Sequence, residues 1–214
     1  MAPGWTGYKN RLLYSTFDVT QQLRMAKTEA CVLGVEVAEG WFAGRLSWGD
    51  RRYLYGNRLA FLAQLEIRYK DRDQAYVIIS DNTWKSHHSA TIRAEIYDGE
   101  DYDIREETLG WNSDPSFRES QSWIATEELE FPSAHLVSSD TPPVRITETV
   151  SPIKIFKSAS GKTLIDFGQN LVGTLHVRLP STDNEGHVIT FTHAEVLEHD
   201  ELGTRPLRSA KQID

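Results

Sequence analysis

Apolar side chains recur at every second position between residues 59 and 69. They are Leu59, Phe61, Ala63, Leu65, Ile67 and Tyr69. A period of two places these side chains on one face of a strand, and an α-helix cannot bring them to one face. The charged residues 70–74 then predict a hairpin tip, and residues 75–79 predict the return strand. The centre of the chain is therefore restricted to an antiparallel β fold.

A second apolar, β-branched run at residues 32–37 predicts another strand, and a long loop separates it from the hairpin. The loop contains Gly40, Gly44, Gly49 and Gly56 and is dense in aromatic and charged residues. Loops of this length in compact domains are usually functional or disordered. Disorder is disfavoured here, because solvated aromatic rings forgo the free energy of burial.

The composition of this loop fits a sugar-binding surface. Aromatic rings cover the C–H faces of a sugar, while carboxylate, amide and guanidinium groups hydrogen-bond to its hydroxyls. The candidate ligand residues are Glu39, Trp41, Arg45, Asp50, Arg51, Tyr55 and Asn57. The alternative is that the rings pack beneath the loop as a small satellite core, which is the commoner fate of large apolar side chains. Residue spacing leaves both interpretations open.

The charge balance excludes some classes of partner. The chain has 31 acidic and 23 basic residues and a formal net charge of −8, with no sustained Lys/Arg run. It therefore lacks the electrostatic footprint of a nucleic-acid-binding protein. No apolar stretch is long enough to span a bilayer, so a membrane partner is not expected either. The first ten residues lack the apolar segment of a signal peptide, which makes a cytoplasmic location the default and secretion the expectation if the natural chain begins upstream.

Metal ligands are sparse. Cys31 is the only cysteine, and its position beside an apolar run predicts a buried, inert thiol. The acidic turn around Gly99 contains Asp98, Glu100, Asp101 and Asp103, and hard oxygen ligands of this kind suit calcium. The spacing does not match an EF-hand loop, and an acidic surface turn is the commoner explanation. Calcium is thus the one cofactor candidate, and none is certain.

Two prolines mark the clearest boundary in the chain, at residues 138–143. They remove backbone donors and hold the chain extended. We predict a first β-sandwich domain over residues 1–137, a linker over 138–143 and a second domain over 144–214. The second domain shows short runs typical of antiparallel strands at residues 144–149, 153–157, 163–167, 173–179 and 187–193. No long amphipathic helix is expected, so the predicted fold class is all-β.

No catalytic pair is evident among the acidic residues. Glycoside hydrolysis needs two carboxyl groups at a fixed separation, one of them in an apolar setting that raises its pKa. No pair in this sequence occupies such a setting, and no Gly-x-Ser-x-Gly elbow is present. The residues alone indicate a β-sandwich protein with one candidate ligand loop.

Six segments carry a family resemblance. They are PGWTGYKNRLLYSTFDVT (residues 3–20), GVEVAEGWFAGR (34–45), YGNRLAFLAQLEI (55–67), EIYDGEDYDIR (95–105), LIDFGQNLVGTLHVRL (164–179) and HAEVLEHDELGTRPLRSAKQID (193–214). In this order they resemble the amino-terminal half of the multidomain α-L-rhamnosidases of bacteria and fungi. The resemblance implies a galactose-binding-like β-sandwich followed by the first strands of a concanavalin-like β-sandwich. In the family, an (α/α)6 barrel with the catalytic carboxylates follows.

The resemblance also implies what this chain lacks. Family members have further strands before the Pro-Gly-Trp-Thr element, and the barrel lies beyond the region that matches residue 214. Both sandwiches are therefore expected to be truncated, and no catalytic residue of the family has a counterpart here. The implied protein is the accessory carbohydrate-binding portion of an α-L-rhamnosidase, inactive alone, with a rhamnose-containing glycoside or glycan and an intramolecular catalytic barrel as partners.

Two other interpretations stand beside this one. The first is a structural β-sandwich that docks against the barrel and supports it without binding sugar. The second is an independently active glycosidase, which requires a carboxylate pair facing one cleft.

Overall fold

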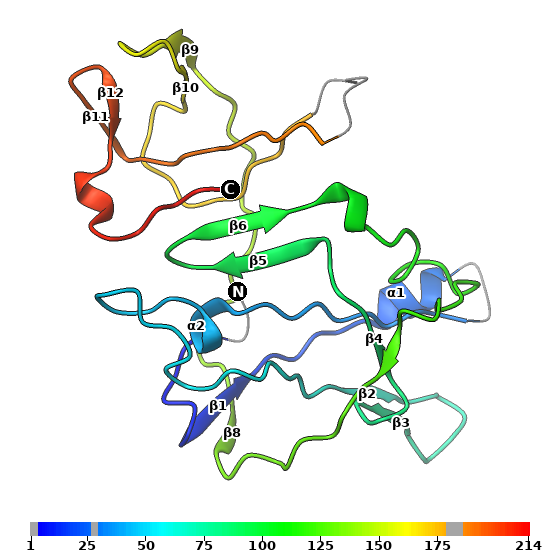
Figure 1. Ribbon diagram of the computed structural model, residues 1–214. Helices are drawn as coiled ribbons and strands as arrows, with labels where there is room; N and C mark the ends of the chain where they lie inside the picture. Colours follow the sequence, from blue (N-terminus) through cyan, green and yellow to red (C-terminus); the bar gives the residue numbers. More distant parts are fainter. Residues whose placement is uncertain (1–3, 27–29, 179–185) are drawn as a thin grey trace. The chain divides into compact units, whose positions relative to one another are not determined.

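The computed structural model describes residues 4–26, 30–178 and 186–214. The chain forms two compact units, unit 1 (Met1–Ile96 and Glu100–Ser139) and unit 2 (Tyr97–Gly99 and Asp140–Asp214). Short strands make up most of the regular structure, with few short helices (Figure 1). The all-β prediction is confirmed. Among the described residues, no helix has the length and apolar character needed to cross a membrane.

Unit 1 contains most of the regular elements. In chain order they are β1 (Arg11–Tyr14), α1 (Thr20–Met25), α2 (Gly40–Ala43), β2 (Gln64–Ile67), β3 (Tyr76–Ile79), β4 (Lys85–Ser86), β5 (Thr91–Glu95), β6 (Gly99–Tyr102), the 3-10 helix η1 (Ile104–Glu106), β7 (Ile124–Ala125) and β8 (His135–Ser138). The strands pair two at a time as β1–β8, β2–β3, β4–β7 and β5–β6. The β1–β8 pair is parallel and joins the two ends of the unit, as Figure 1 shows.

The predicted central hairpin is present as β2 and β3. The two strands are antiparallel, with Gln64 opposite Ile79 and Ile67 opposite Tyr76. At residues 61, 63, 65 and 67 the side chains are half-buried, and the intervening ones are exposed. The alternation in the sequence therefore corresponds to alternating burial in the structure. The strand β2 covers only residues 64–67 of the alternating run at residues 59–69.

The prediction of a strand at residues 32–37 is wrong. The described residues 30–39 contain no strand, and the backbone at Gly34 lies instead against the ring of Trp111. A Cβ added at Gly34 would stand 2.6 Å from a ring carbon of Trp111, so this segment packs on a side chain in place of a neighbouring strand. Cys31, predicted to be buried, is exposed.

Unit 2 is built on two hairpins. Its elements are β9 (Lys154–Lys157), β10 (Thr163–Asp166), β11 (Val196–Glu198), β12 (Glu201–Gly203) and the 3-10 helix η2 (Arg205–Leu207). β9 and β10 match two predicted runs and are antiparallel, with the buried Leu164 opposite Phe156. The predicted strands at 144–149 and 173–178 are not formed, residue 179 lies outside the described part, and 187–193 contributes a single bridge from Thr192 to Ile213.

Four strand pairs were not predicted: β1–β8, β4–β7, β5–β6 and β11–β12. β11 and β12 form a hairpin whose central residues, His199 and Asp200, have φ of 52° and 60°, the backbone of a type I′ turn. The sequence concealed this turn, because Asn-Gly and Asp-Gly are its usual signals. β8 ends at Ser138, the first residue of the predicted linker. The predicted domain bounds themselves stay a prediction.

Candidate functional site

The loop of residues 39–57 is anchored by α2 and by its own backbone. Beyond the helix, the N–H of Leu46 donates to the carbonyl of Arg51 at 2.8 Å, and the N–H of Tyr53 donates to the carbonyl of Ala43 at 3.1 Å. Ala43 and Leu46 are 2% and 6% exposed. The base of the loop is therefore buried and hydrogen-bonded.

The outer part of the loop has an unusual backbone. Ser47, Asp50 and Tyr53 have φ of 72°, 57° and 59°, in the left-handed region that non-glycine residues rarely occupy. This backbone turns large side chains outward: Trp48 is 69% and Tyr53 58% exposed. Backbone strain of this kind tends to collect at ligand-binding sites.

The loop contacts a buried carboxylate, that of Glu95, the last residue of β5. Glu95 accepts hydrogen bonds from Nη1 and Nη2 of Arg52 at 2.6 and 2.8 Å, and from the backbone N–H of Arg45 at 2.5 Å. A bidentate guanidinium–carboxylate pair is among the stronger polar contacts in proteins. Gly44 is required beside it, because an added Cβ would stand 2.7 Å from Glu95 Oε2 and 2.4 Å from the Gly40 carbonyl.

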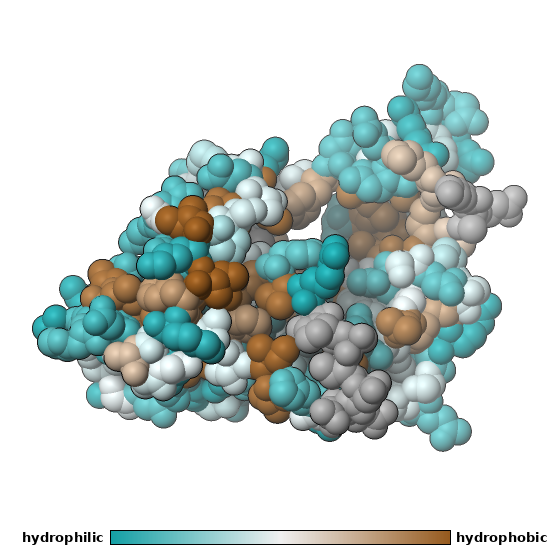
Figure 2. Space-filling view, turned by 90° about the horizontal axis from the view of Figure 1, so that it is seen from above, coloured by the Kyte–Doolittle hydropathy of each residue, from teal (hydrophilic) through white to brown (hydrophobic). Residues whose placement is uncertain are grey.

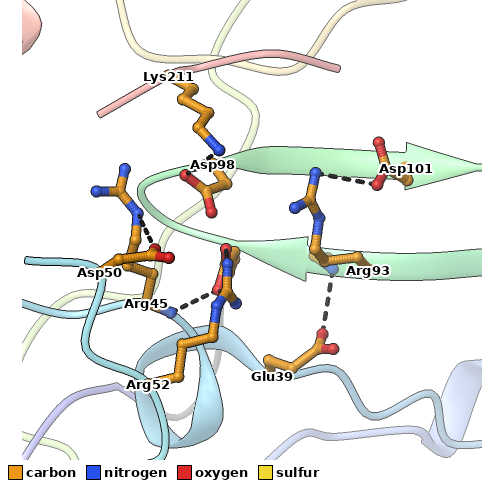
Figure 3. A network of polar contacts seen from close by, with 10 residues as sticks. Glu39, Arg45, Asp50, Arg52, Arg93, Asp98, Asp101 and Lys211 are labelled. Atoms are coloured by element: carbon orange, nitrogen blue, oxygen red, sulfur yellow. Dashed lines mark hydrogen bonds and ion pairs between the residues drawn. The ribbon is translucent and has the colours of Figure 1, made fainter. Parts of the chain in front are cut away.

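Arg45 and Asp50, both predicted ligand residues, are brought together. Arg45 Nε lies 3.7 Å from Asp50 Oδ1, and the two side chains are 6% and 74% exposed (Figure 3). The side chain of Arg45 is therefore buried, and the carboxylate of Asp50 is the accessible member of the pair.

Trp41 and Tyr55 meet in an aromatic cluster formed by Trp5, Tyr8, Trp41, Phe42 and Tyr55. The rings of Trp5 and Trp41 stack with centroids 5.2 Å apart and planes at 13°. Trp5 Nε1 donates to the hydroxyl of Tyr55 at 3.0 Å, and Tyr8 meets both Tyr55 and Phe42 edge-on. Burial, and to a lesser degree the neighbouring Tyr55, raise the pKa of Tyr8. One face of Trp41 is thus covered, and Trp5 remains 51% exposed.

The three remaining predicted residues are placed separately. Glu39 is half-buried, and its Oε2 accepts the N–H of Ala94 at 3.2 Å. Arg51 and Asn57 are exposed. Asp50, Arg51 and Asn57 are therefore accessible to solvent, whereas Glu39 contacts β5, and sugar binding by these residues stays a prediction.

Sequence reasoning missed four residues of this region: Trp5, Tyr8, Arg52 and Glu95. Trp5 and Glu95 lie about 50 positions from the residues that they contact, and no local pattern reports such pairs. Arg52 stands next to Arg51, and nothing in the sequence distinguishes the buried partner from the exposed one. The one signal in the sequence was the position of Glu95, a carboxylate at the end of the segment that precedes the acidic turn.

In the acidic turn, three of the four candidate calcium ligands, Asp98, Asp101 and Asp103, lie against cations. Asp98 is 1% exposed and lies 3.8 Å from Lys211 Nζ, both in unit 2 (Figure 3). Asp101 in unit 1 accepts from Arg93 at 3.0 Å. Each of these carboxylates already has a positive partner.

Asp103 and Glu100 complete that set. Asp103 holds Arg105 through its side chain and accepts the Arg105 backbone N–H at 3.0 Å, and the hydrogen bonds from Arg105 lower the pKa of Asp103 to about 2. Glu100 is exposed. Within the described ranges, no three His, Cys, Asp or Glu side chains gather as a metal site. Calcium binding stays a prediction.

Two family models match the chain. Residues 1–148 match the alpha-L-rhamnosidase N-terminal domain, and residues 156–214 match the bacterial alpha-L-rhamnosidase concanavalin-like domain. Among curated relatives, the alpha-L-rhamnosidase of Streptomyces avermitilis is 37% identical over 218 residues, which cover 100% of this chain and 20% of the relative. The chain thus spans about a fifth of the length of the curated relatives that it matches.

Solved structures agree with these matches. The native alpha-L-rhamnosidase of Aspergillus terreus is similar over 100% of this chain and 24% of its own, with a TM-score of 0.85 and 41% identity. The Streptomyces avermitilis enzyme, solved as a complex with L-rhamnose, is similar over 100% of this chain and 20% of its own, with a TM-score of 0.82 and 34% identity. The chain therefore belongs to the alpha-L-rhamnosidase family, in which it matches the N-terminal domain and the start of the concanavalin-like domain.

Proposed function

We propose that this chain is the accessory carbohydrate-binding portion of an alpha-L-rhamnosidase acting on terminal α-L-rhamnosides. The loop of residues 39–57 carries the proposal, because an anchored, hydrogen-bonded base presents exposed rings and polar groups together. Soluble proteins gain free energy by covering rings as large as Trp48 and Tyr53, so leaving both exposed on a fixed loop favours a ligand-facing role.

The accessible side chains suit a sugar. Trp48, Tyr53 and the outer face of Trp5 supply ring surfaces, while Trp41 supports Trp5 from behind. The carboxylate of Asp50 accepts from hydroxyls and Arg51 donates to them. The buried guanidinium of Arg45 forms an ion pair with Asp50, with Nε 3.7 Å from Oδ1.

L-Rhamnose is the first ligand to test, since a relative similar over the whole chain was solved with it. A monosaccharide gains little from one ring face and a few polar contacts, because association costs entropy. Its Kd should therefore be on the order of 0.1–1 mM. Calorimetric or NMR titration with L-rhamnose, with and without calcium, measures this affinity and the metal requirement.

The variants that test the site are Asp50→Asn and Arg51→Met. Each removes one charged hydrogen-bonding group and should weaken binding about tenfold. Arg58→Met is the matched control, because Arg58 is an exposed arginine that pairs with Glu127 at 2.7 Å outside the loop. Unchanged affinity in both loop variants, or no saturable binding by the unmodified chain, would refute the proposal.

We also propose that the chain does not hydrolyse rhamnosides by itself. The chain matches the N-terminal domain and the start of the concanavalin-like domain, and it spans about a fifth of the length of the curated relatives that it matches. Glycoside hydrolysis needs two carboxyl groups at a fixed separation, and the sequence shows no such pair. Turnover of an aryl α-L-rhamnoside that is lost on mutating one of the chain's own carboxylates would contradict this.

A second function, structural support of a catalytic barrel, is favoured by the amount of exposed apolar surface. Large apolar side chains are exposed in each unit, for example Phe17 (72%) in unit 1 and Val144 (93%) in unit 2. Figure 2 shows apolar residues at the surface in several places. Surface of this kind usually meets a partner.

Mixing the chain with a separately produced barrel region of the Streptomyces avermitilis relative tests this support role. Co-elution on a sizing column together with an absence of rhamnose binding would favour support over sugar recognition. Rhamnose binding without co-elution would favour the first function.

A further inference from the structure

Unit 2 contains a cavity of about 430 Å³ that no predicted site residue lines. Its lining residues are Ser160, Lys162, Thr192, Glu201, Leu202 and Thr204. The volume lies within the range of about 300–1,000 Å³ that is usual for small-molecule sites. All six residues belong to unit 2, so the cavity shares no residue with the loop of residues 39–57 in unit 1.

The turns of the two hairpins frame this cavity. The N–H of Ala159, between β9 and β10, donates to the carbonyl of Asp200, between β11 and β12, at 3.2 Å. Ser158 is buried, and its Oγ accepts the N–H of Lys162 at 3.1 Å while its own N–H donates to the Lys162 carbonyl at 2.9 Å. The walls that carry Ser160, Lys162 and Glu201 are therefore fixed by backbone hydrogen bonds.

Glu201 provides a fixed acceptor at the cavity. The N–H of Ser160 donates to its Oε1 at 2.5 Å. The hydrogen bonds from Ser160, with smaller contributions from Ser158 and the charge of Lys162, lower the pKa of Glu201. The carboxylate is therefore ionised at neutral pH, and its remaining lone pairs are available as acceptors.

The other lining groups complement this carboxylate. Lys162 offers an ammonium donor, and the hydroxyls of Ser160, Thr192 and Thr204 both donate and accept. Leu202 adds one apolar side chain. The formal charges of Lys162 and Glu201 cancel, so the lining does not select for a charged ligand. A neutral molecule with several neighbouring hydroxyls uses every one of these groups.

We propose that this cavity is a second carbohydrate-binding site, which takes a neutral mono- or disaccharide between Glu201 and Lys162. The hydroxyls of the sugar donate to Glu201 and accept from Lys162, while its C–H face lies against Leu202. The proposal does not depend on the rhamnose site proposed for the loop, because the two sites share no residue.

The test is an amide chemical-shift titration of the whole chain with L-rhamnose, D-glucose, D-galactose and α-L-rhamnosyl-(1→6)-D-glucose. At least one sugar should shift the amides of Ser160, Lys162 and Leu202 in a saturable way. Glycine, a zwitterion, is included because an ammonium and a carboxylate together also suit an amino acid. Shifts produced by glycine and by none of the sugars would overturn the proposal, as would no shift at these amides with any sugar.

Matched variants assign the site. Glu201→Gln and Lys162→Met should each weaken binding about tenfold. Glu198→Gln is the control, because Glu198 pairs with Glu201 across the same hairpin yet contacts Arg205 and does not line the cavity. Equal weakening by all three would overturn the proposal.

The same titration distinguishes the two sites. Asp50→Asn should remove the loop response and leave the shifts at residues 160–162 unchanged. Loss of the cavity response in Asp50→Asn would refute the second site without deciding the first. If either cavity variant melts below the unmodified chain, the other variant and the amide shifts decide.

Discussion

At the scale of single residues, two adjacent arginines have opposite surroundings. Arg52 binds the buried carboxylate of Glu95 through both Nη atoms, and its side chain is 27% exposed. Arg51 is exposed, and its backbone carbonyl accepts the N–H of Leu46 at 2.8 Å. Two identical side chains at neighbouring positions thus have different roles: Arg52 stabilises the fold, and Arg51 faces solvent.

This contrast predicts the stability of two variants. Arg52→Met leaves a buried carboxylate without its main partner and should lower the free energy of unfolding by about 2–4 kcal/mol, somewhat less than for a fully buried pair. Arg51→Met should change it by less than about 0.5 kcal/mol. Urea unfolding of both proteins measures the difference, and equal losses would show that the Arg52–Glu95 pair does not anchor the loop.

Asp103 predicts a pH dependence. Its pKa falls to about 2 in the folded chain because Arg105 hydrogen-bonds to it, against about 3.9 in an unfolded chain. A depressed pKa stabilises the fold above about pH 4, and this contribution is lost as pH falls toward about 2. The melting-temperature difference between the unmodified chain and Asp103→Asn should therefore shrink over that window. A difference that stays constant with pH would contradict the assignment.

At the scale of elements, α2 and the loop that follows it divide two roles between their tryptophans. Trp41 on α2 is half-buried and stacked on Trp5, whereas Trp48 is 69% exposed. Both tryptophans belong to the loop of residues 39–57.

We expect Trp41→Ala to cost about 1.5–3 kcal/mol of stability, because it removes a stacked, half-buried ring. Trp48→Ala should leave the thermal melt unchanged and weaken rhamnose binding. Melting and titration of both variants test this division of roles. A stable Trp41→Ala protein that no longer binds rhamnose would make Trp41 the direct sugar platform instead.

At the scale of the whole molecule, each unit exposes apolar side chains that a closed core would cover. In unit 2, Val144, Ile146 and Val172 are 93%, 87% and 105% exposed, and Leu164 is its one buried large apolar residue among those described. β9 and β10 also place Ile155 opposite Ile165, 65% and 46% exposed, on the face away from Leu164. Two-stranded sheets with uncovered faces are marginally stable by themselves.

The isolated chain should therefore bind the dye ANS and self-associate as its concentration rises. Dye fluorescence and sedimentation measure both. Replacing Ile155 and Ile165 by threonine should reduce dye binding, and Ile78→Thr, at a half-buried position in β3, serves as the comparison. A monomer with a sharp cooperative melt and no dye binding would show that these faces are covered within the chain.

The sequence by itself determined the local and compositional features. Alternation at residues 61–67 specified the β2–β3 hairpin, because a period of two is written into neighbouring residues. The absence of a helical period specified the all-β class, and the composition of residues 39–57 located the candidate loop. The six resembling segments alone indicated the family.

Only the tertiary structure decided which distant groups meet. It paired β1 with β8 across more than 100 positions, stacked Trp41 on Trp5, and assigned Glu95 to Arg52 rather than Arg51. It also left residues 32–37 without a strand, because a strand needs a partner and this run found the ring of Trp111 instead. Local sequence encodes what a segment can form, whereas contact partners depend on how the whole chain packs, and the ligand-facing side chains are those that such packing leaves uncovered.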